Sequence, residues 1–185
     1  PQYDAALTEI FSQSSDPVGM IRHWHEFAGY AIQPRRPIPS FWLLIGKGAN
    51  GKSKLLDIIR RLVGSQGVLS EPISRFQNDR FALSSLEGKK LLIDDDVDED
   101  LILGDGLIKK LSEEKAVTAR RPYGRKKKEF MSIALPVMAG NHYPTTKDIS
   151  PGMQRRTFVI PFERIFGPDE QQPDLFEHIW QHERS

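Results

Sequence analysis

The run Gly46-Lys47-Gly48-Ala49-Asn50-Gly51-Lys52-Ser53 fits the spacing G-x-x-x-x-G-K-[ST] at every fixed position. Backbone N–H groups of such a glycine-rich turn can point inward around phosphate oxygens, and a helix beginning there adds a partial positive charge. Lys52 is expected to reach the β- and γ-phosphates of a nucleotide, and the Ser53 hydroxyl is expected to hold Mg²⁺. The predicted phosphate-binding residues are Gly46, Gly48, Ala49, Asn50, Gly51, Lys52, Ser53 and Lys54.

Three consecutive aspartates form the natural partner of this loop. Asp94-Asp95-Asp96 follow the apolar run Leu91-Leu92-Ile93, so a buried strand delivers carboxylates at its carboxyl end, beside the expected nucleotide. One carboxylate would hold Mg²⁺, directly or through water, and the next would polarise the attacking water. Because side chains alternate along a strand, the sequence leaves open which aspartate has which role.

Two further positions carry groups suited to phosphate chemistry. Asn141 ends a strand, where its amide can hydrogen-bond both the γ-phosphate and the lytic water, although an asparagine in Gly-Asn-His-Tyr-Pro also suits a plain turn. Arg155 and Arg156 precede another strand, and an arginine at a subunit edge can neutralise a neighbour's γ-phosphate. The alternative for these arginines is an ion pair with the acidic run.

A basic hairpin is predicted over residues 116–130, with Pro122-Tyr123-Gly124 as its turn. Basic side chains contact nucleic-acid phosphates, and an aromatic ring can stack on a base or a ribose. The candidate DNA-binding residues are Arg120, Arg121, Tyr123, Arg125, Lys126, Lys127 and Lys128.

The elements that would position these groups alternate between helix and strand. The phosphate loop lies between a strand at 41–45 and a helix at 55–63 that stops at Gly64. This alternation predicts a mostly parallel α/β sheet. The other expected elements are helical stretches within 1–38, a strand at 67–70, a helix at 79–86, a strand at 89–93, a helix at 101–111, strands at 132–139 and 157–160, and a helix at 174–183.

Composition sets the class of protein. The chain has 185 residues, no cysteine and a formal net charge of +1. The absence of cysteine excludes disulfide and thiol chemistry and suits the reducing cytoplasm, here expected to be that of a bacterial host cell. No apolar run approaches the roughly 18 residues of a membrane span, so a membrane partner is not expected. The chain begins with Pro1, and we interpret it as a piece of something longer.

The order of these motifs resembles the superfamily 3 helicases, and most closely the ATPase domain of phage and plasmid primase-helicases. The resemblance covers roughly residues 20–165 and includes the phosphate loop, the acidic strand end, the basic hairpin, Asn141 and Arg155-Arg156 before Phe158-Val159-Ile160-Pro161-Phe162. It implies an AAA+-like fold with a five-stranded parallel sheet and a hairpin before the asparagine strand.

The same resemblance implies roles for individual residues. Lys52 and Ser53 would be the Walker A pair, Asp95 and Asp96 the Walker B acids that act with Mg²⁺, and Asn141 the first sensor. Arg155 or Arg156 would act on the ATP of the neighbouring subunit. Family members form hexameric rings that translocate on single-stranded DNA, often with a primase domain upstream. The expected division is a helical lead-in at 1–38, an ATPase core at 39–165 and the start of a truncated helical region at 166–185.

Two other functions stay open at this stage. An initiator or loader, in which ATP gates DNA binding without unwinding, needs the same ring and the same DNA contacts. A small-molecule kinase would share the phosphate loop but would leave the basic hairpin unexplained. Many ATPases place a glutamate beside the Walker B aspartate, but Asp94-Asp95-Asp96 has only aspartates, and the candidate Glu99 lies three residues beyond Asp96.

Overall fold

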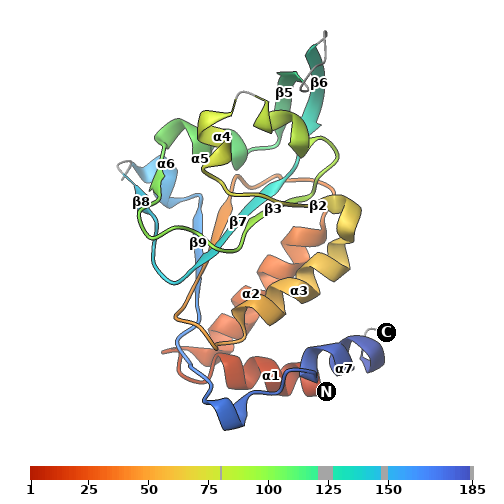
Figure 1. Cartoon of the computed structure of the whole chain (residues 1–185), viewed down its shortest axis with the longest axis vertical. Helices are drawn as coiled ribbons and strands as arrows, with labels where there is room; N and C mark the ends of the chain where they lie inside the picture. Colours follow the sequence, from red (N-terminus) through yellow and green to blue (C-terminus); the bar gives the residue numbers. More distant parts are fainter. Residues whose placement is uncertain (80, 121–126, 147–149, 184–185) are drawn as a thin grey trace.

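The fold is an α/β sandwich around one parallel sheet (Figure 1). The computed structural model describes residues 1–79, 81–120, 127–146 and 150–183. Within them, five strands follow the order β2-β3-β7-β1-β9, and every neighbouring pair is parallel. This confirms the predicted AAA+-like fold class. The strands are β1 Phe41–Ile45, β2 Val68–Ser70, β3 Leu91–Asp94, β7 Leu135–Gly140 and β9 Thr157–Pro161.

Alternating strand residues feed two separate cores, one on each face of the sheet. Trp42 and Leu44 of β1 pack into the core under the longer helices, whereas Leu43 and Ile45 pack into the core on the other face. The first face is covered by α1 Gln2–Ile10, α2 Pro17–Ile32 and α3 Lys52–Val63. The second is covered by α4 Arg75–Asn78, the 3₁₀ turn η2 Ala82–Leu86, α5 Asp105–Leu111 and α6 Pro151–Gln154.

Because all five strands run the same way, the sheet has two chemically different edges. At the edge formed by the carboxyl ends, hereafter the carboxyl edge, β1 leads into the phosphate loop and β3 ends at Asp94. At the opposite, amino edge, β7 and β9 begin at Leu135 and Thr157. Each site residue can therefore be assigned to an edge from its place in the chain.

The hairpin predicted at 116–130 is present as β5 Lys115–Arg120 paired antiparallel with β6 Lys127–Ser132. It projects from the top of the molecule in Figure 1, far from the phosphate loop. The predicted turn at 122–124 lies outside the described residues. Ser132, expected at the start of the next strand, ends β6 instead, and β7 starts three residues later.

Pro136 is accommodated inside β7 because of where the strand ladders begin. It pairs with Leu92 on the β3 side, but the register with β1 starts one residue later, at Val137. The N–H of Leu135 donates towards β3, to the carbonyl of Lys90. Successive N–H groups of a strand point to opposite neighbours, so an N–H at position 136 would point towards β1. The β1 ladder begins only at Val137, so the N–H that proline lacks is not needed there.

Two predicted helices are wrong in extent. Of the described residues in the helix expected over 79–86, only Ala82–Leu86 are helical, as the 3₁₀ turn η2, and the short α4 precedes them. The residues expected to be helical from 101 begin with β4 Ile102–Leu103, which pairs with β8 Thr145–Thr146, and α5 starts only after Gly104. Burial of Leu103 favours the strand pairing, and Gly104 favours a break between this strand and the helix α5.

The ends of the chain meet below the sheet in Figure 1. The carboxylate of Glu183, which follows α7 Leu175–His182, accepts the backbone N–H groups of Gln2 and Tyr3 at 2.7 and 3.1 Å. A 3₁₀ turn η3 Pro168–Glu170 and the segment before α7 connect this layer to β9. The first and last helices therefore form one layer next to the phosphate loop. None of the described helices is long and apolar enough to cross a bilayer.

Candidate functional site

The phosphate loop has the backbone conformation of an open turn at the carboxyl edge. Gly51 has φ +82° and Ala49 has φ +52°, which is uncommon for a residue with a side chain. A Cβ on Gly46 would lie 2.4 Å from both the Asn50 amide nitrogen and the Phe162 carbonyl, so only glycine fits there. The buried Asn50 side chain braces the turn, donating to the Lys47 carbonyl at 3.1 Å and accepting from the Lys52 N–H at 3.3 Å.

Lys52 is held inside the loop. The residue is 8% exposed, and its Nζ donates to the carbonyls of Gly46 at 3.0 Å and Gly140 at 2.7 Å. Burial lowers the pKa of this ammonium, and the nearby Asp96 carboxylate opposes the shift. A buried ammonium held by two carbonyl oxygens is suited to exchange them for phosphate oxygens.

The three aspartates lie in different environments. Asp94 is 7% exposed and accepts the N–H of Ile73 at 2.7 Å; burial raises the pKa of its carboxyl, and that N–H opposes the shift. Asp95 is exposed and pairs with Arg60 of α3 at 2.5 Å. Asp96 lines the pocket beside the phosphate loop together with Asp95, whereas Asp94 does not.

This pocket has a volume of about 640 Å³ and joins three predicted components of the site. Its walls include the phosphate loop from Gly48 to Lys54, the acidic run from Asp95 to Glu99, and Asn141 at the end of β7. The N–H of Val97 donates to the Ala139 carbonyl at 3.2 Å, which holds the acidic run against β7. The structure thus brings together Lys52, Ser53, Asp95, Asp96 and Asn141.

The other walls of the pocket come from the two ends of the chain, which sequence reasoning did not include. α1 contributes Ala6, Glu9 and Ile10, and the C-terminal segment contributes Phe166, Glu170, Gln171, Gln172, Pro173, Leu175 and Phe176. The N–H of Phe166 donates to the Ala49 carbonyl at 2.7 Å, so this segment is attached to the phosphate loop. Arg164 joins both ends, pairing with Glu9 at 2.9 Å and with Glu170 at 2.8 Å.

Oxygen donors suited to Mg²⁺ line the pocket. The Ser53 hydroxyl and the carboxylates of Asp95 and Asp96 are hard ligands of the type that Mg²⁺ takes alongside substrate phosphates and water. Glu99 also lines the pocket, but its carboxylate pairs with His142 Nε2 at 2.7 Å. Within the described ranges, no group of three or more acidic, histidine or cysteine side chains forms a complete metal site by itself.

The two predicted arginines lie at the amino edge and differ from each other. Arg156 is 8% exposed and pairs with Glu113 at 2.5 Å, so its guanidinium is held within its own chain. The partner of Arg156 is therefore Glu113 and not a carboxylate of the acidic run after β3, which was the alternative expected from the sequence. Arg155 is exposed, and no ion pair of its side chain is found among the described residues. Of the two, only Arg155 is presented to solvent.

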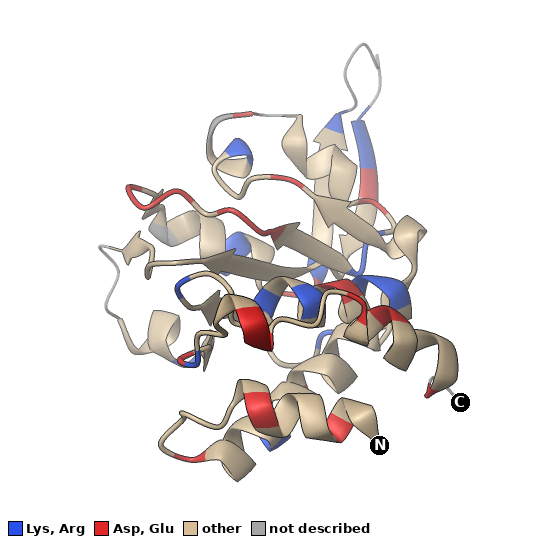
Figure 2. Ribbon diagram, turned by 60° about the horizontal axis from the view of Figure 1, so that its bottom comes forward, with Lys and Arg blue, Asp and Glu red and all other residues tan. Residues whose placement is uncertain are grey.

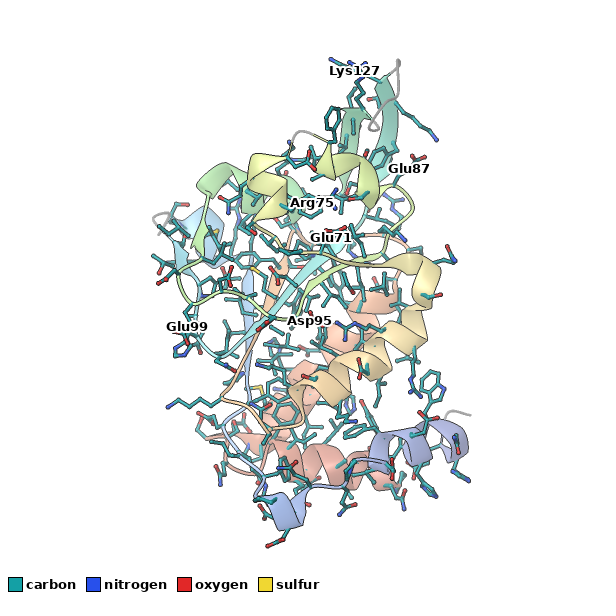
Figure 3. The ribbon with its side chains drawn as sticks, in the orientation of Figure 1. Glu71, Arg75, Glu87, Asp95, Glu99 and Lys127 are labelled. Atoms are coloured by element: carbon teal, nitrogen blue, oxygen red, sulfur yellow. The ribbon has the colours of Figure 1, made fainter. Side chains whose placement is uncertain are left out.

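The basic residues of the hairpin lie apart from the acidic pocket. Figure 2 shows the acidic segment after β3 and the blue residues of the hairpin in separate regions, and Figure 3 shows Lys127 near the hairpin end and Asp95 near the middle of the molecule. Lys127 is exposed, and Lys128 pairs with Glu87 beside η2. Arg120 ends β5. Arg121, Tyr123, Arg125 and Lys126 lie outside the described residues.

Comparison with known proteins supplies a family. Residues 44–156, more than half of the chain, match the family described as "Family of unknown function (DUF5906)". The chain belongs to this family. The matched residues span the phosphate loop, the acidic run, the hairpin and Asn141, and they end at Arg156.

This chain is also similar to a curated relative and to solved structures. A protein of Acanthamoeba polyphaga mimivirus named "Putative helicase L207/L206" is 30% identical over 129 residues, which are 66% of this chain and 13% of that protein. The C-terminal region of NrS-1 superposes with a TM-score of 0.72 at 18% identity, over 97% of this chain and 42% of that one. This chain therefore spans less than half of either protein, and the second likeness shows a shared fold.

Proposed function

We propose that this chain is an ATP-dependent DNA helicase motor of the superfamily 3 type, from a phage or plasmid replication protein. The observation that carries the proposal is the pocket at the carboxyl edge, where the phosphate loop, the acidic strand end and Asn141 line one cavity. The similarity to a protein named a putative helicase supports the same class of function. We propose ATP and Mg²⁺ as the ligands of this pocket.

The residues of the pocket would divide the chemistry among them. Lys52 would leave its two carbonyl partners and bind the β- and γ-phosphates, while Ser53 and Asp96 would hold Mg²⁺, which neutralises charge on the phosphates. Asp95 would orient the attacking water, and Asn141 would bind the γ-phosphate and that water. Arg60 already fixes one orientation of the Asp95 carboxylate.

The two ends of the chain would accommodate the nucleoside. Ile10 and Phe176 offer apolar surface to a planar base, and Gln171 and Gln172 carry amides that can hydrogen-bond its edge. The 166–176 segment is attached to the phosphate loop through Phe166 and Ala49. The lead-in and the C-terminal segment would therefore belong to the ATP site and not to separate domains.

Arg155 would act on a neighbouring subunit. β9 begins two residues after Arg155 and runs parallel to β1, which ends at the phosphate loop. The full length of five paired residues therefore separates Arg155 from the phosphate loop of the same chain. At about 3.3 Å per residue this is roughly 15 Å, too far for Arg155 to reach its own γ-phosphate. A homo-oligomeric ring, expected to be a hexamer, would bring Arg155 to the next subunit's ATP.

The hairpin would contact single-stranded or forked DNA in the pore of that ring. Its basic residues lie at the amino edge, away from the acidic pocket, so phosphate binding there does not compete with ATP (Figure 2). The proposed DNA contacts are Arg120, Arg121, Tyr123, Arg125, Lys126, Lys127 and Lys128. A primase domain, fused or associated, is the expected upstream partner.

ATP hydrolysis measured with and without single-stranded DNA, at two protein and two salt concentrations, tests this function. We expect DNA to raise turnover, turnover per subunit to rise with protein concentration, and the DNA effect to weaken steeply with salt because it rests on phosphate contacts. Lys52→Ala should abolish turnover under every condition. Binding of ATP with flat turnover in a protein that assembles would indicate an ATP-gated module instead.

A further inference from the structure

Two consecutive glutamates anchor the base of the basic hairpin to different parts of the molecule. Glu113 and Glu114 lie between α5 and the first residue of β5, Lys115. The carboxylate of Glu114 accepts from Arg35 Nε at 3.1 Å and from the backbone N–H of Arg36 at 2.7 Å, in the connector after α2. The carboxylate of Glu113 accepts from Arg156 Nη2 at 2.5 Å, beside the start of β9.

Arg156 fixes the backbone on which Arg155 is presented. Its Nη1 donates to the Gly152 carbonyl of α6 at 2.7 Å, and its own carbonyl accepts the N–H of Phe41, the first residue of β1, at 2.9 Å. The side chain is buried, so its position depends closely on its charged partner Glu113. A displacement of Glu113 would therefore move the α6–β9 junction, and Arg155 is part of that junction.

We infer that Glu113 is a positioning residue that couples the hairpin to Arg155. DNA bound to the hairpin displaces its base, Glu113 transmits this displacement to Arg156, and Arg155 is thereby placed against the ATP of the neighbouring subunit. This inference rests on the proposed function. It would link DNA contact at one end of the amino edge to hydrolysis in a pocket that neither the described hairpin residues nor Arg155 line in their own chain.

Stability alone gives a weak reason for this ion pair. The Arg156 guanidinium is buried and the Glu113 carboxylate is half-buried, so forming the pair costs desolvation, mainly of the guanidinium, and apolar side chains of similar volume often stabilise a buried site equally well. The Nε of Arg156 is buried and has no hydrogen-bond partner within the described part of the chain. An ion pair that leaves one buried donor unsatisfied is not optimised for rigidity. It is better suited to a junction that moves between two arrangements.

Glu113→Gln tests the coupling, and Glu114→Gln is its matched control. Both variants remove one charge at the hairpin base, but only Glu113 contacts Arg156. Four quantities are measured for each full chain: the midpoint of thermal unfolding, affinity for a single-stranded oligonucleotide, turnover without DNA and turnover with saturating DNA. We expect Glu113→Gln to lower the ratio of DNA-stimulated to basal turnover by about fivefold or more, with DNA affinity retained. Glu114→Gln should keep the wild-type ratio.

A double-mutant cycle separates coupling from general damage. If Glu113 acts through Arg156, Glu113→Gln combined with Arg156→Gln should lower the ratio no further than the stronger single variant does. An unchanged ratio in Glu113→Gln, or an equal fall in Glu114→Gln, overturns the inference while wild-type stimulation by DNA upholds the proposed function. A wild-type chain that DNA does not stimulate overturns both. Should Glu113→Gln not fold, Glu113→Asp, which keeps the charge at a shorter reach, takes its place.

Discussion

Three identical side chains in a row have three different surroundings in this protein. Asp94 is turned into the fold and accepts the N–H of Ile73, Asp95 pairs with Arg60 of the neighbouring helix, and the Asp96 carboxylate opposes the lowering of the Lys52 pKa by burial. Their roles follow from these environments and not from residue type. Asp94 supports the strand end, so we propose that Asp95 and Asp96, which line the pocket, are the two that act in the reaction.

Replacing the aspartates one at a time by asparagine should distinguish these roles. Asp94→Asn should retain Mg²⁺-dependent ATP hydrolysis, since the amide oxygen can still accept the Ile73 N–H and the buried charge is removed. Asp96→Asn should lower hydrolysis by about tenfold or more and weaken the dependence on Mg²⁺. Steady-state turnover across an Mg²⁺ titration measures both. Equal losses in the two variants would contradict the assignment.

The buried ammonium of Lys52 should be visible in the pH dependence of stability. Because its pKa is lowered in the folded chain, the unfolded chain binds more protons between that lowered pKa and the ordinary lysine value of about 10.4. The free energy of unfolding should therefore rise with pH in this window for the wild type, relative to Lys52→Met. Denaturant unfolding from pH 7 to 10 measures it, with Lys54→Met at an exposed neighbouring position as the control.

At the scale of elements, the nucleoside end of the pocket depends on contacts between the two ends of the chain. Arg164 pairs with Glu9 of α1 and with Glu170 of η3, and its guanidinium carbon lies 4.7 Å from the centre of the Phe166 ring. Its side chain is mostly buried. One residue thus holds together the walls that would surround the base.

Arg164→Ala should weaken ATP binding without affecting DNA binding. Losing this residue would free the segment carrying Phe166 from α1, so we expect KM for ATP to rise several-fold while kcat changes less. Arg75→Ala is a suitable control, because Arg75 also pairs with two carboxylates, those of Glu71 and Asp79, on the other face of the sheet (Figure 3). Equal rises in KM for both variants would show that general destabilisation, not the pocket wall, was measured.

The predictable elements were those specified by local sequence. The strand at 41–45, the loop after it and the helix ending at Gly64 combine a short apolar run, fixed glycines and helical spacing within about 25 residues. The hairpin was equally local. Helix 101–111 was wrong in extent because β4 is stabilised by β8, more than 40 residues away in the chain, and no local pattern records that pairing.

The parts of the site that sequence reasoning missed depend on distant contacts. Ile10 and Phe166 line the same pocket from opposite ends of the chain, although each reads locally as an ordinary apolar residue. Likewise, nothing near Arg156 in the sequence indicates Glu113 as its partner. The phosphate loop could be recognised because backbone geometry fixes its spacing, whereas pocket walls require only suitable surfaces brought together by the fold.

At the scale of the whole molecule, the parallel sheet separates two kinds of surface. The carboxyl edge holds the pocket with Lys52, and the amino edge holds Arg155 and the base of the hairpin. Arg155 and the phosphate loop of one chain lie at opposite edges of the sheet, so we propose that Arg155 acts on the phosphate loop of a neighbouring chain. Hydrolysis should therefore require two chains, each contributing one edge.

Mixing two inactive variants tests this division. Lys52→Ala should bind no ATP but still present Arg155, and Arg155→Ala should bind ATP without hydrolysing it. In an equimolar mixture that exchanges subunits randomly, about one quarter of the interfaces combine an intact Lys52 with an intact Arg155 from the neighbour. We expect turnover up to about that fraction of wild type, appearing only after mixing and only at concentrations where light scattering detects assembly. The control is the doubly substituted chain mixed with either variant, in which no interface combines both residues. A first mixture no more active than this control would mean that Arg155 does not act across the subunit boundary, because both components of a competent interface would be present without restoring hydrolysis.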